Sequence, residues 1–419
     1  MSSSDRTSGR PTSYPIRPIP LCNSPGRLTR TVLGTERCAY DDGTESLMIR
    51  YELEEPRMSR LPNVVVVGVA VLSMVMGVAG VLVPSAGTAA ADTLTGVRYA
   101  KATAGAPYRE TWVSPRNLVV SVWSRSMQTQ VPSLVQTPAN RNQAAPVMYL
   151  LSGSSGGEDN DDWTHATDAN AFYANKNVWT VTPIGGAASY YADWRRVDPA
   201  ANFRFGVKTS RPLRWETFLT SELPAAFENA HGGRSGPGRS RGVAGISMAG
   251  TAVLRIAENH PGFYRAVGSY SGCADTASPT GQLLLRNVVF VPGLADASNM
   301  YGPPGDPQWA AQDPVINAYK FGRRTPALWI SAATGLPGAH DNLSDRRIAG
   351  NVGELAEQVA AGGFAEATAR SCTVTMANRL AALRIPAVVR LPATGTHSWG
   401  YWEDQMHESW PMFARALGA

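Results

Sequence analysis

The chain has 419 residues, of which 38 are basic and 33 acidic, and its formal net charge is +5 at pH 7. This charge is too small and too scattered to indicate a nucleic acid-binding surface, so we expect no nucleic acid partner. Neither of the zinc-ligand patterns CxxC and HExxH occurs in the sequence, and we expect no bound metal and no other cofactor.

The N-terminal part of the chain has the composition of a leader and an export signal. Residues 1–57 are rich in Ser, Arg, Pro and Thr without apolar periodicity, which predicts a disordered leader. Residues 64–83 form an uncharged apolar run that small residues follow up to Ala91, so residues 58–91 are predicted to be a signal peptide cleaved after Ala91. Translation from Met58 would then leave the leader unmade, and the protein would be secreted or held at the cell envelope. An uncleaved anchor is the alternative, since a helix of about 20 apolar residues spans a bilayer.

From residue 92 onward, short β-rich runs alternate with helical ones. This alternation predicts one α/β domain over residues 92–419, with a mostly parallel central sheet and helices on both faces. We expect strands at residues 118–124, 147–151, 178–183, 241–246, 266–270, 327–332 and 387–391. We expect helices at residues 215–229, 249–259 and 372–384. Trp215 shares an apolar helix face with three other residues and is expected in the core, whereas the Gly- and Pro-rich residues 281–314 indicate an insertion or lid.

The segment Gly245-Ile246-Ser247-Met248-Ala249 ends a predicted strand and begins a predicted helix. A serine on such a sharp strand-to-helix turn is typical of the nucleophile elbow of α/β-hydrolases. The elbow pattern has glycine two residues after the serine, where this chain has alanine, so the motif alone does not establish a nucleophile. Ser247 requires a histidine and an acid further along the chain.

Six histidines are candidates for the base. In α/β-hydrolases the base follows the last strand of the sheet. His165 and His231 precede the serine, and His260 lies on the helix after it. His340 follows an earlier strand, and His407 lies in a predicted terminal helix. These five histidines are therefore excluded by position. His397 follows the strand at residues 387–391 directly, and it is the predicted base.

The acid is not selected by position alone. Several carboxylates follow the strand at residues 327–332, namely Asp341, Asp345, Glu354, Glu357 and Glu366. Cys273 and Cys372 are expected to pair if the domain is exported, with two buried free thiols as the alternative. Such a bridge would tether the segment of Glu366 to the loop after the strand at residues 266–270.

The Gly- and Ser-rich residues 152–157 follow an early predicted strand. An α/β-hydrolase stabilises its tetrahedral intermediate with the amide of the residue after the nucleophile, here Met248, and with an amide from such a loop. We expect Ser154 to supply the second amide, and a merely flexible loop is the alternative. The acidic residues 158–162 superficially resemble a calcium loop, but Thr164 stands where that loop needs glycine, so we expect a solvated turn.

From about residue 94 to the C-terminus, the chain resembles the antigen 85 and corynebacterial mycolyltransferases, a family of secreted acyltransferases with the α/β-hydrolase fold. The most specific segments are PIGGAASYYADW at 183–194, WETFLTSELP at 215–224, GISMA at 245–249 and GTHSWGYW at 395–402. The resemblance implies a catalytic triad of Ser247, His397 and Glu366, because the family's acid is a glutamate nine residues before a threonine, here Thr375. It also implies oxyanion amides at Ser154 and Met248.

The family transfers mycolic acids, which are long branched fatty acids, between trehalose esters and onto cell-wall arabinogalactan. The resemblance therefore implies a mycolyl ester donor and a sugar acceptor, trehalose or arabinogalactan, as partners. It also implies a ping-pong route through an acyl-enzyme on Ser247. Trp399, two residues after the predicted base, is expected to line the acyl or sugar groove.

One departure from the family concerns the acceptor. Many members bind trehalose with an aspartate and an arginine of the early loop, where this chain has Ser152 and Ser155. Serines still form hydrogen bonds to a sugar, but charge-assisted contacts worth roughly 1.5 to 3 kcal/mol each are lost. Trehalose is therefore only one candidate acceptor. Two further alternatives are a secreted carboxylesterase, which gives the acyl group to water, and a non-catalytic cell-wall or host-matrix binding protein.

Overall fold

The computed structural model describes residues 38–39, 45–46, 93–94, 96–200, 211–231 and 240–419. The chain divides into two compact units, Met1–Val64 and Val65–Ala419. In the first unit, β1 (Cys38–Ala39) pairs antiparallel with β2 (Glu45–Ser46). The predicted leader, apart from these two strands, and the predicted signal at residues 58–91 lie outside the described residues and stay predictions. The sections below concern the second unit.

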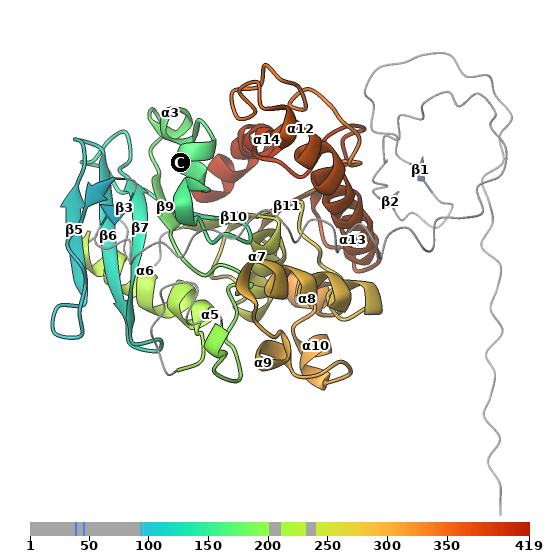
Figure 1. Cartoon of the computed structure of the whole chain (residues 1–419), viewed down its shortest axis with the longest axis horizontal. Coiled ribbons are helices and arrows are strands. Elements are labelled where there is room, and N and C mark those ends of the chain that lie inside the picture. The colour runs from blue at the N-terminus through green and yellow to red at the C-terminus, as the bar shows by residue number, and fades with distance from the viewer. Residues whose placement is uncertain (1–37, 40–44, 47–92, 95, 201–210, 232–239) are drawn as a thin grey trace, which may run out of the picture. The chain divides into compact units, whose positions relative to one another are not determined.

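The centre of this unit is a sheet that has nine strands within the described residues, in the order β13-β12-β11-β10-β8-β9-β7-β6-β5 (Figure 1). These strands are β5 (Tyr108–Trp112), β6 (Asn117–Ser124), β7 (Thr129–Gln136), β8 (Val147–Leu151), β9 (Trp179–Pro183), β10 (Arg241–Ile246), β11 (Ala266–Tyr270), β12 (Ala327–Ser331) and β13 (Val388–Arg390). The strands from β9 to β13 are parallel, while β5, β6 and β7 extend the sheet antiparallel. A short antiparallel pair, β3 (Thr93–Leu94) and β4 (Val97–Arg98), precedes it.

Alternate residues of the central strands contribute to two separate apolar cores. Tyr149 and Val243 belong to one core, while the next residues, Leu150 and Ala244, belong to the other. This is expected because successive side chains of a strand point to opposite faces of the sheet. The first core includes side chains of α6 (Leu223–Ala230), α7 (Met248–Asn259), α8 (Pro279–Gly293) and α13 (Gly363–Ala382).

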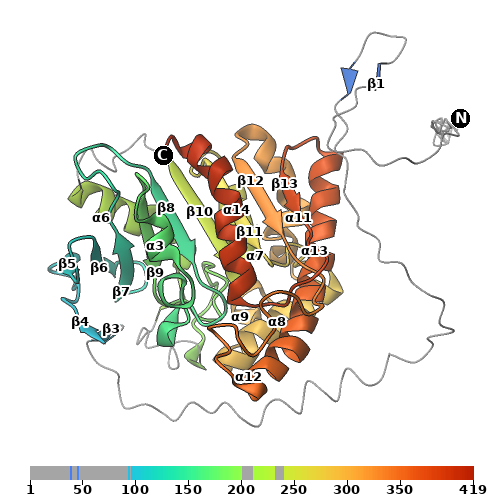
Figure 2. The ribbon, with the colours of Figure 1, turned by 90° about the horizontal axis from the view of Figure 1, so that it is seen from above.

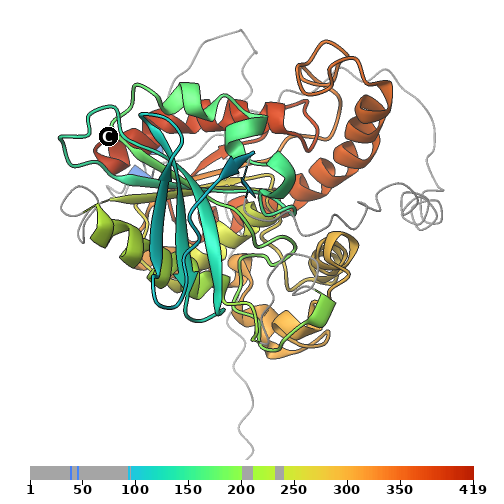
Figure 3. The same cartoon turned by 60° about the vertical axis from the view of Figure 1, so that its left-hand side comes forward.

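The second core is closed by α2 (Trp163–Ala166), α3 (Ala169–Tyr173) and the C-terminal helix α14 (Trp399–Leu417). Figure 2 looks onto the face of the sheet that α14 crosses, and Figure 3 shows α14, in red, on the opposite side of the sheet from the yellow-green α6. Helices thus cover both faces of a mostly parallel sheet, which confirms the predicted fold class.

The predicted helix at residues 215–229 is one helix with a π turn inside it. It consists of α5 (Trp215–Thr217), the π turn Phe218–Glu222 and α6. Pro224 has no N–H to donate within the helix, and a π turn accommodates such a gap in the ladder. Trp215 is buried in the first core, as predicted.

Residues 281–314 lie between β11 and β12, as the predicted insertion does, and they are mostly helical. They form most of α8, together with α9 (Ser298–Tyr301), α10 (Pro307–Ala311) and the start of α11 (Pro314–Asn317). Pro279, Pro307 and Pro314 each stand at the start of a helix, where the missing N–H costs nothing. The residue before each of them caps the helix through its side chain. The prolines therefore mark helix starts rather than loop.

Helix α13 begins at Gly363, well before the predicted start at residue 372. It is preceded by α12 (Val352–Glu357) and the π turn Gln358–Gly362. The earlier start places Glu366 on the first turn of α13, where its side chain is buried. The remaining short helices are the 3-10 turns Glu158–Asn160 and Ala318–Arg323. Among the residues that the structure describes, no helix is both long and apolar enough to cross a membrane.

Candidate functional site

Ser247 lies on the turn between β10 and α7, with φ 53° and ψ −122°. A positive φ is strained for a residue with a side chain, and such strain occurs most often at functional sites. The Ser247 amide donates to the carbonyl of Tyr270 on β11, 2.8 Å away. A Cβ at Gly245 would lie 2.6 Å from the carbonyl oxygen of Ala249, so the first position of the elbow requires glycine. The structure accommodates alanine at the second position, and the turn has the geometry of a nucleophile elbow.

His397 lies between the serine and an acid. Its Nε2 is 2.8 Å from the Ser247 Oγ, and its Nδ1 is 2.8 Å from a carboxylate oxygen of Glu366. The amide of His397 donates to the carbonyl of Gly362, and its ring packs edge-on against Trp402. The structure therefore brings together Ser247, His397 and Glu366, three residues that are far apart in the sequence.

Glu366 is held by groups that the sequence analysis did not single out. Its second oxygen accepts the Ser271 hydroxyl at 2.9 Å and the Ala333 amide at 2.6 Å. Trp402 in turn donates its indole N–H to the Ser271 oxygen. Ser271 directly follows β11 and Ala333 lies just after β12, so both stand at the carboxyl edge of the sheet. Their position after the parallel strands was the signal that could have identified them.

The other candidate acids do not contact His397. Asp341 accepts hydrogen bonds from Thr396 and Tyr401, and Asp345 accepts one from His340. Glu354 and Glu357 are exposed on α12. Among the five candidates, the structure places only Glu366 beside the imidazole.

The other five histidines also have carboxylate partners. These pairs are His165 with Asp162, His231 with Glu110, His260 with Glu216, His340 with Asp345 and Asp404, and His407 with Asp168. A histidine–carboxylate pair is thus common in this chain and does not itself identify a base. Within the described residues, the contact with a serine hydroxyl distinguishes His397.

The loop at residues 152–157 passes directly beside the elbow, since a Cβ at Gly153 would lie 3.5 Å from the Cβ of Ser247. Gly156 has φ 68°, and a Cβ there would lie 2.5 Å from the amide nitrogen of Ala187, so glycine is required. In the described part of the chain, neither the Ser154 amide nor the Met248 amide donates a hydrogen bond. Two unpaired amides therefore accompany the nucleophile, one from each side, as an oxyanion site requires.

The three residues predicted to contact substrate differ in exposure. Ser152 is fully buried, and its Oγ has no partner in the described residues, so this hydroxyl is not presented to solvent. Ser155 is half-buried and donates to the carbonyl of Asp161. Trp399 donates to the Asp161 carboxylate at 2.5 Å and packs edge-on against Trp163. Ser155 and Trp399 are accessible to a substrate, whereas Ser152 is not.

The acidic run at residues 158–162 is a solvated turn in part: residues 159–161 are exposed, as predicted, whereas the last residue of the run is buried. Asp162 is 1% exposed and caps α2 by accepting from the amides of Thr164 and His165. Glu158 is half-buried, and this partial burial raises its pKa to about 8. Within the described residues, no cluster of His, Cys, Asp and Glu could hold a metal ion.

Cys273 and Cys372 form the predicted disulfide, with their Cα atoms 4.8 Å apart. It joins the segment after β11, which carries Ser271, to α13, which carries Glu366. Thr251 on α7 exchanges hydrogen bonds with the backbone of Cys273 through its hydroxyl. The disulfide and the Thr251 hydrogen bonds together connect α7, which follows Ser247, with α13, which carries Glu366.

The sequence and the fold match known proteins over most of the chain. The family described as "Putative esterase" matches residues 124–413. The chain is 32% identical over 282 residues to the diacylglycerol acyltransferase/mycolyltransferase Ag85A of Mycobacterium ulcerans, covering 66% of this chain and 75% of the relative. It is also 32% identical over 276 residues to Ag85B of Mycobacterium intracellulare, covering 66% and 76%.

Among solved structures, the fold is similar to that of MPT51 (FbpC1) of Mycobacterium tuberculosis, with a TM-score of 0.53, 24% identity, and coverage of 74% of this chain and 99% of the other. It is also similar to the serine hydrolase FphF of Staphylococcus aureus, with a TM-score of 0.50, 13% identity, and coverage of 73% and 99%. At these identities the structures support the fold alone, while the sequence relatives support the family. The chain belongs to the antigen 85 family of α/β-hydrolase-fold esterases and acyltransferases.

Proposed function

We propose that this protein is an exported serine acyltransferase that moves a mycolyl-type acyl group from an ester donor to a sugar hydroxyl through an acyl-enzyme on Ser247. The observation that carries the proposal is the hydrogen-bonded line from Ser247 through His397 to Glu366, with 2.8 Å at each step. Relatives that are named diacylglycerol acyltransferase/mycolyltransferase support the acyl-transfer chemistry. Export is proposed from the signal-like residues 58–91 and would place the protein outside the cell or at its envelope.

In the proposed acylation step, His397 takes the proton from the Ser247 hydroxyl as the oxygen attacks the ester carbonyl. The imidazole becomes positive at that moment, and the buried Glu366 carboxylate stabilises this charge through Nδ1. Collapse of the tetrahedral intermediate breaks the ester bond, and the leaving alkoxide takes the proton from Nε2. A sugar hydroxyl then repeats the sequence on the acyl-enzyme, which releases the new ester and regenerates the serine.

The negative oxygen of each tetrahedral intermediate would be bound by the amides of Ser154 and Met248. Met248 is the first residue of α7, so its amide is also at the positive end of a helix dipole. Such preorganised donors contribute roughly 3 to 4 kcal/mol each in serine hydrolases. These amides therefore support acyl transfer rather than a purely binding function.

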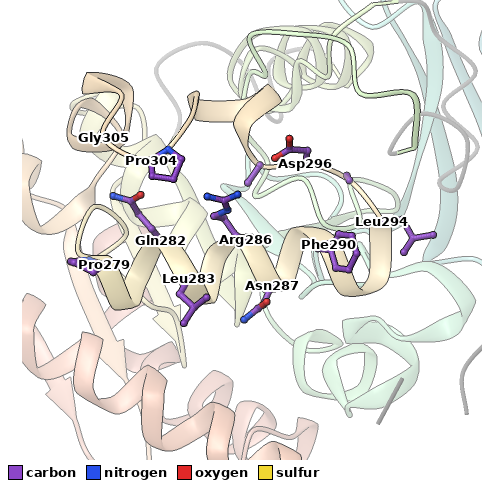
Figure 4. A pocket seen from close by; sticks show the side chains of 12 residues that line it. Pro279, Gln282, Leu283, Arg286, Asn287, Phe290, Leu294, Asp296, Pro304 and Gly305 are labelled. Atoms are coloured by element: carbon purple, nitrogen blue, oxygen red, sulfur yellow. The ribbon is translucent and has the colours of Figure 1, made fainter. Parts of the chain in front are cut away.

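A long acyl chain requires an apolar surface, and helix α8 provides one. Leu283, Phe290 and Val291 expose 62%, 57% and 65% of their surface. A hollow of about 850 Å³ lies between α8 and residues 294–305, with Arg286 and Asp296 at its polar side (Figure 4). We propose this part of the molecule as the place for the donor's acyl tail.

The acceptor is proposed to be a sugar bound without charged side chains from the early loop. Ser152 is buried and Ser155 is half-buried, so neither position offers a charged side chain to a sugar. Trehalose and a wall polysaccharide hydroxyl are both candidate acceptors. Hydrolysis is the second candidate function, because the matching family is described as an esterase.

The test is intact-mass spectrometry of the purified protein after exposure to a mycoloyl ester, with Ser247→Ala as control. We expect a mass increase equal to the acyl group on the wild type and none on the variant. Addition of trehalose or an arabinan fragment should then discharge the adduct faster than water does. An adduct that water removes as fast as either sugar supports the esterase.

The opposite result is equally clear. If the wild type forms no adduct and consumes no ester, the non-catalytic binding protein becomes the better reading. If Ser247→Ala retains full activity, the proposed nucleophile is wrong.

A further inference from the structure

The segment between β9 and α5 contains an unusual concentration of strained backbone. Within residues 185–191, which we call the tyrosine loop, Ala188, Tyr190 and Tyr191 have φ values of 52°, 53° and 46°. Residues with side chains adopt this left-handed conformation rarely, and it persists only where the surroundings impose it. Some group must therefore hold this loop in place.

Arg255 is one group that does so. Its Nη2 donates to the carbonyl of Tyr191 at 2.9 Å and to that of Tyr190 at 3.3 Å. Its Nη1 is bound at the same time by Glu216 at 2.5 Å and by Gln312 at 3.1 Å. The residue is 3% exposed, so the carbonyls of Tyr190 and Tyr191 both accept from a buried guanidinium.

The tyrosine loop touches both segments that carry the proposed oxyanion donors. The Ala188 amide donates to the carbonyl of Ser154 at 2.9 Å. The Tyr190 amide contacts the Met248 sulfur at 3.2 Å, and the Tyr191 hydroxyl donates to the carbonyl of the buried Ser152. A shift of the tyrosine loop would therefore displace residues 152–154, and with them the Ser154 amide.

We propose that Arg255 is a positioning residue for the oxyanion site: it holds the tyrosine loop against residues 152–154 and thereby fixes the Ser154 amide relative to Ser247. The inference rests on the proposed function. Arg255 lies two turns along α7 from the nucleophile, about 12 Å along the helix axis, so it does not touch the reacting atoms. Helix α7, which follows Ser247, thus also holds the tyrosine loop in position through Arg255.

Arg255→Lys tests this role, because one ammonium cannot replace a fork that bonds two carbonyls and a carboxylate together. With p-nitrophenyl butyrate as substrate, we expect kcat to fall about 10- to 100-fold, less than after loss of a whole oxyanion donor. KM should change by less than about threefold, since the ground state does not use the oxyanion site. A trifluoromethyl ketone, which forms a tetrahedral oxyanion on the serine, should lose affinity in parallel with kcat/KM.

The matched control is Arg241→Lys. Arg241 forms a bidentate pair with Glu228, at 2.7 Å for both contacts, and it does not contact the tyrosine loop. Both variants should lower Tm, but the Arg241 variant should keep kcat within about twofold. Equal losses of kcat in the two variants, or a normal kcat in Arg255→Lys, would overturn the inference.

A rescue experiment separates positioning from general destabilisation. Ala188→Gly removes the steric penalty of a positive φ, because glycine adopts that region freely. Added to Arg255→Lys, it should recover part of kcat and leave KM unchanged. If Arg255→Lys does not fold, Gln312→Leu removes one acceptor of the guanidinium at a half-buried position and should lower kcat in the same direction by a smaller factor. Absence of both effects would refute the role of Arg255, whereas an active Ser247→Ala protein would instead refute the proposed function.

Discussion

Two histidines lie beside the first turn of α14, and their surroundings give them opposite chemistry. His397 binds one carboxylate, Glu366, through Nδ1 and presents Nε2 to the Ser247 hydroxyl. His340 binds a carboxylate at each nitrogen, Asp345 at Nδ1 and Asp404 at Nε2. An imidazole with two carboxylates must donate at both nitrogens, which requires the protonated form.

The pKa of His340 follows this arrangement. The hydrogen bond to Asp404, the largest favourable contribution, and the one to Asp345 raise the pKa of His340 above its usual 6.5 against a smaller effect of burial. A histidine held protonated cannot accept a proton from a serine. A histidine that acts as a general base needs one carboxylate partner and one ring nitrogen that is left for the nucleophile. A second carboxylate partner, as at His340, favours the protonated imidazole instead.

Removal of the two imidazoles, one at a time, should have very different effects on catalysis. We expect His397→Gln to lower kcat/KM roughly 10⁴- to 10⁶-fold, as removal of a triad member does in serine hydrolases. His340→Gln should leave kcat/KM within about threefold, because this side chain does not reach the serine. Ester hydrolysis rates of the two purified variants measure both effects, and similar losses in the two would mean that the assignment of the base is wrong.

Amide substitutions of the carboxylate partners should also affect the two histidines differently. Glu366→Gln keeps the shape of the acid but places an amide where His397, Ser271 and Ala333 all need an acceptor. The imidazole then loses its correct tautomer and the stabilisation of its charge, so we expect kcat to fall roughly 10³- to 10⁴-fold. Asp345→Asn is the matched change at His340 and should leave kcat unchanged. A normal kcat in Glu366→Gln would exclude this residue as the acid.

The disulfide allows a smaller perturbation of the same acid. It joins the segment of Ser271 to the helix of Glu366, and its loss is expected to cost roughly 2 to 5 kcal/mol of stability. Reductant should therefore lower both Tm and turnover of the wild type while leaving a Cys273→Ala/Cys372→Ala variant indifferent to it. Turnover that is equal with and without reductant, at a temperature where both forms are folded, would limit the disulfide to stability.

Parts of this molecule are predictable from the sequence because their causes are local. The strand, turn and helix around Ser247 follow from neighbouring residues, and so do the buried parallel strands. The strand Tyr108–Trp112 was missed because it carries Arg109 and Glu110, and Thr129–Gln136 because it carries Pro132. Neither strand is the apolar run that marks a doubly covered strand.

The acid side of the site is different, because its contacts join distant segments. Only the fold brings Ser271 and Ala333 to Glu366. The resemblance to the antigen 85 family pointed to Glu366, whereas position along the chain left five carboxylates open. Arg255 had no sequence signal at all, since the partners of an arginine in the middle of a helix are evident only in three dimensions.

The protonation of His340 should make the stability of the protein depend on pH. Since the folded protein raises the pKa of His340, it binds this proton more tightly than the unfolded chain does, and the stabilisation is complete below pH about 6.5 and lost as the pH rises through the folded-state value. Asp404 is half exposed, so the pair contributes at most about 1 kcal/mol. Asp404→Asn should therefore lower Tm by a few degrees at pH 5.5 and by less at pH 9, with unchanged kcat. A Tm difference that is constant across this range would mean that His340 does not carry its charge in the folded protein, and the contrast with His397 would have to rest on the serine contact alone.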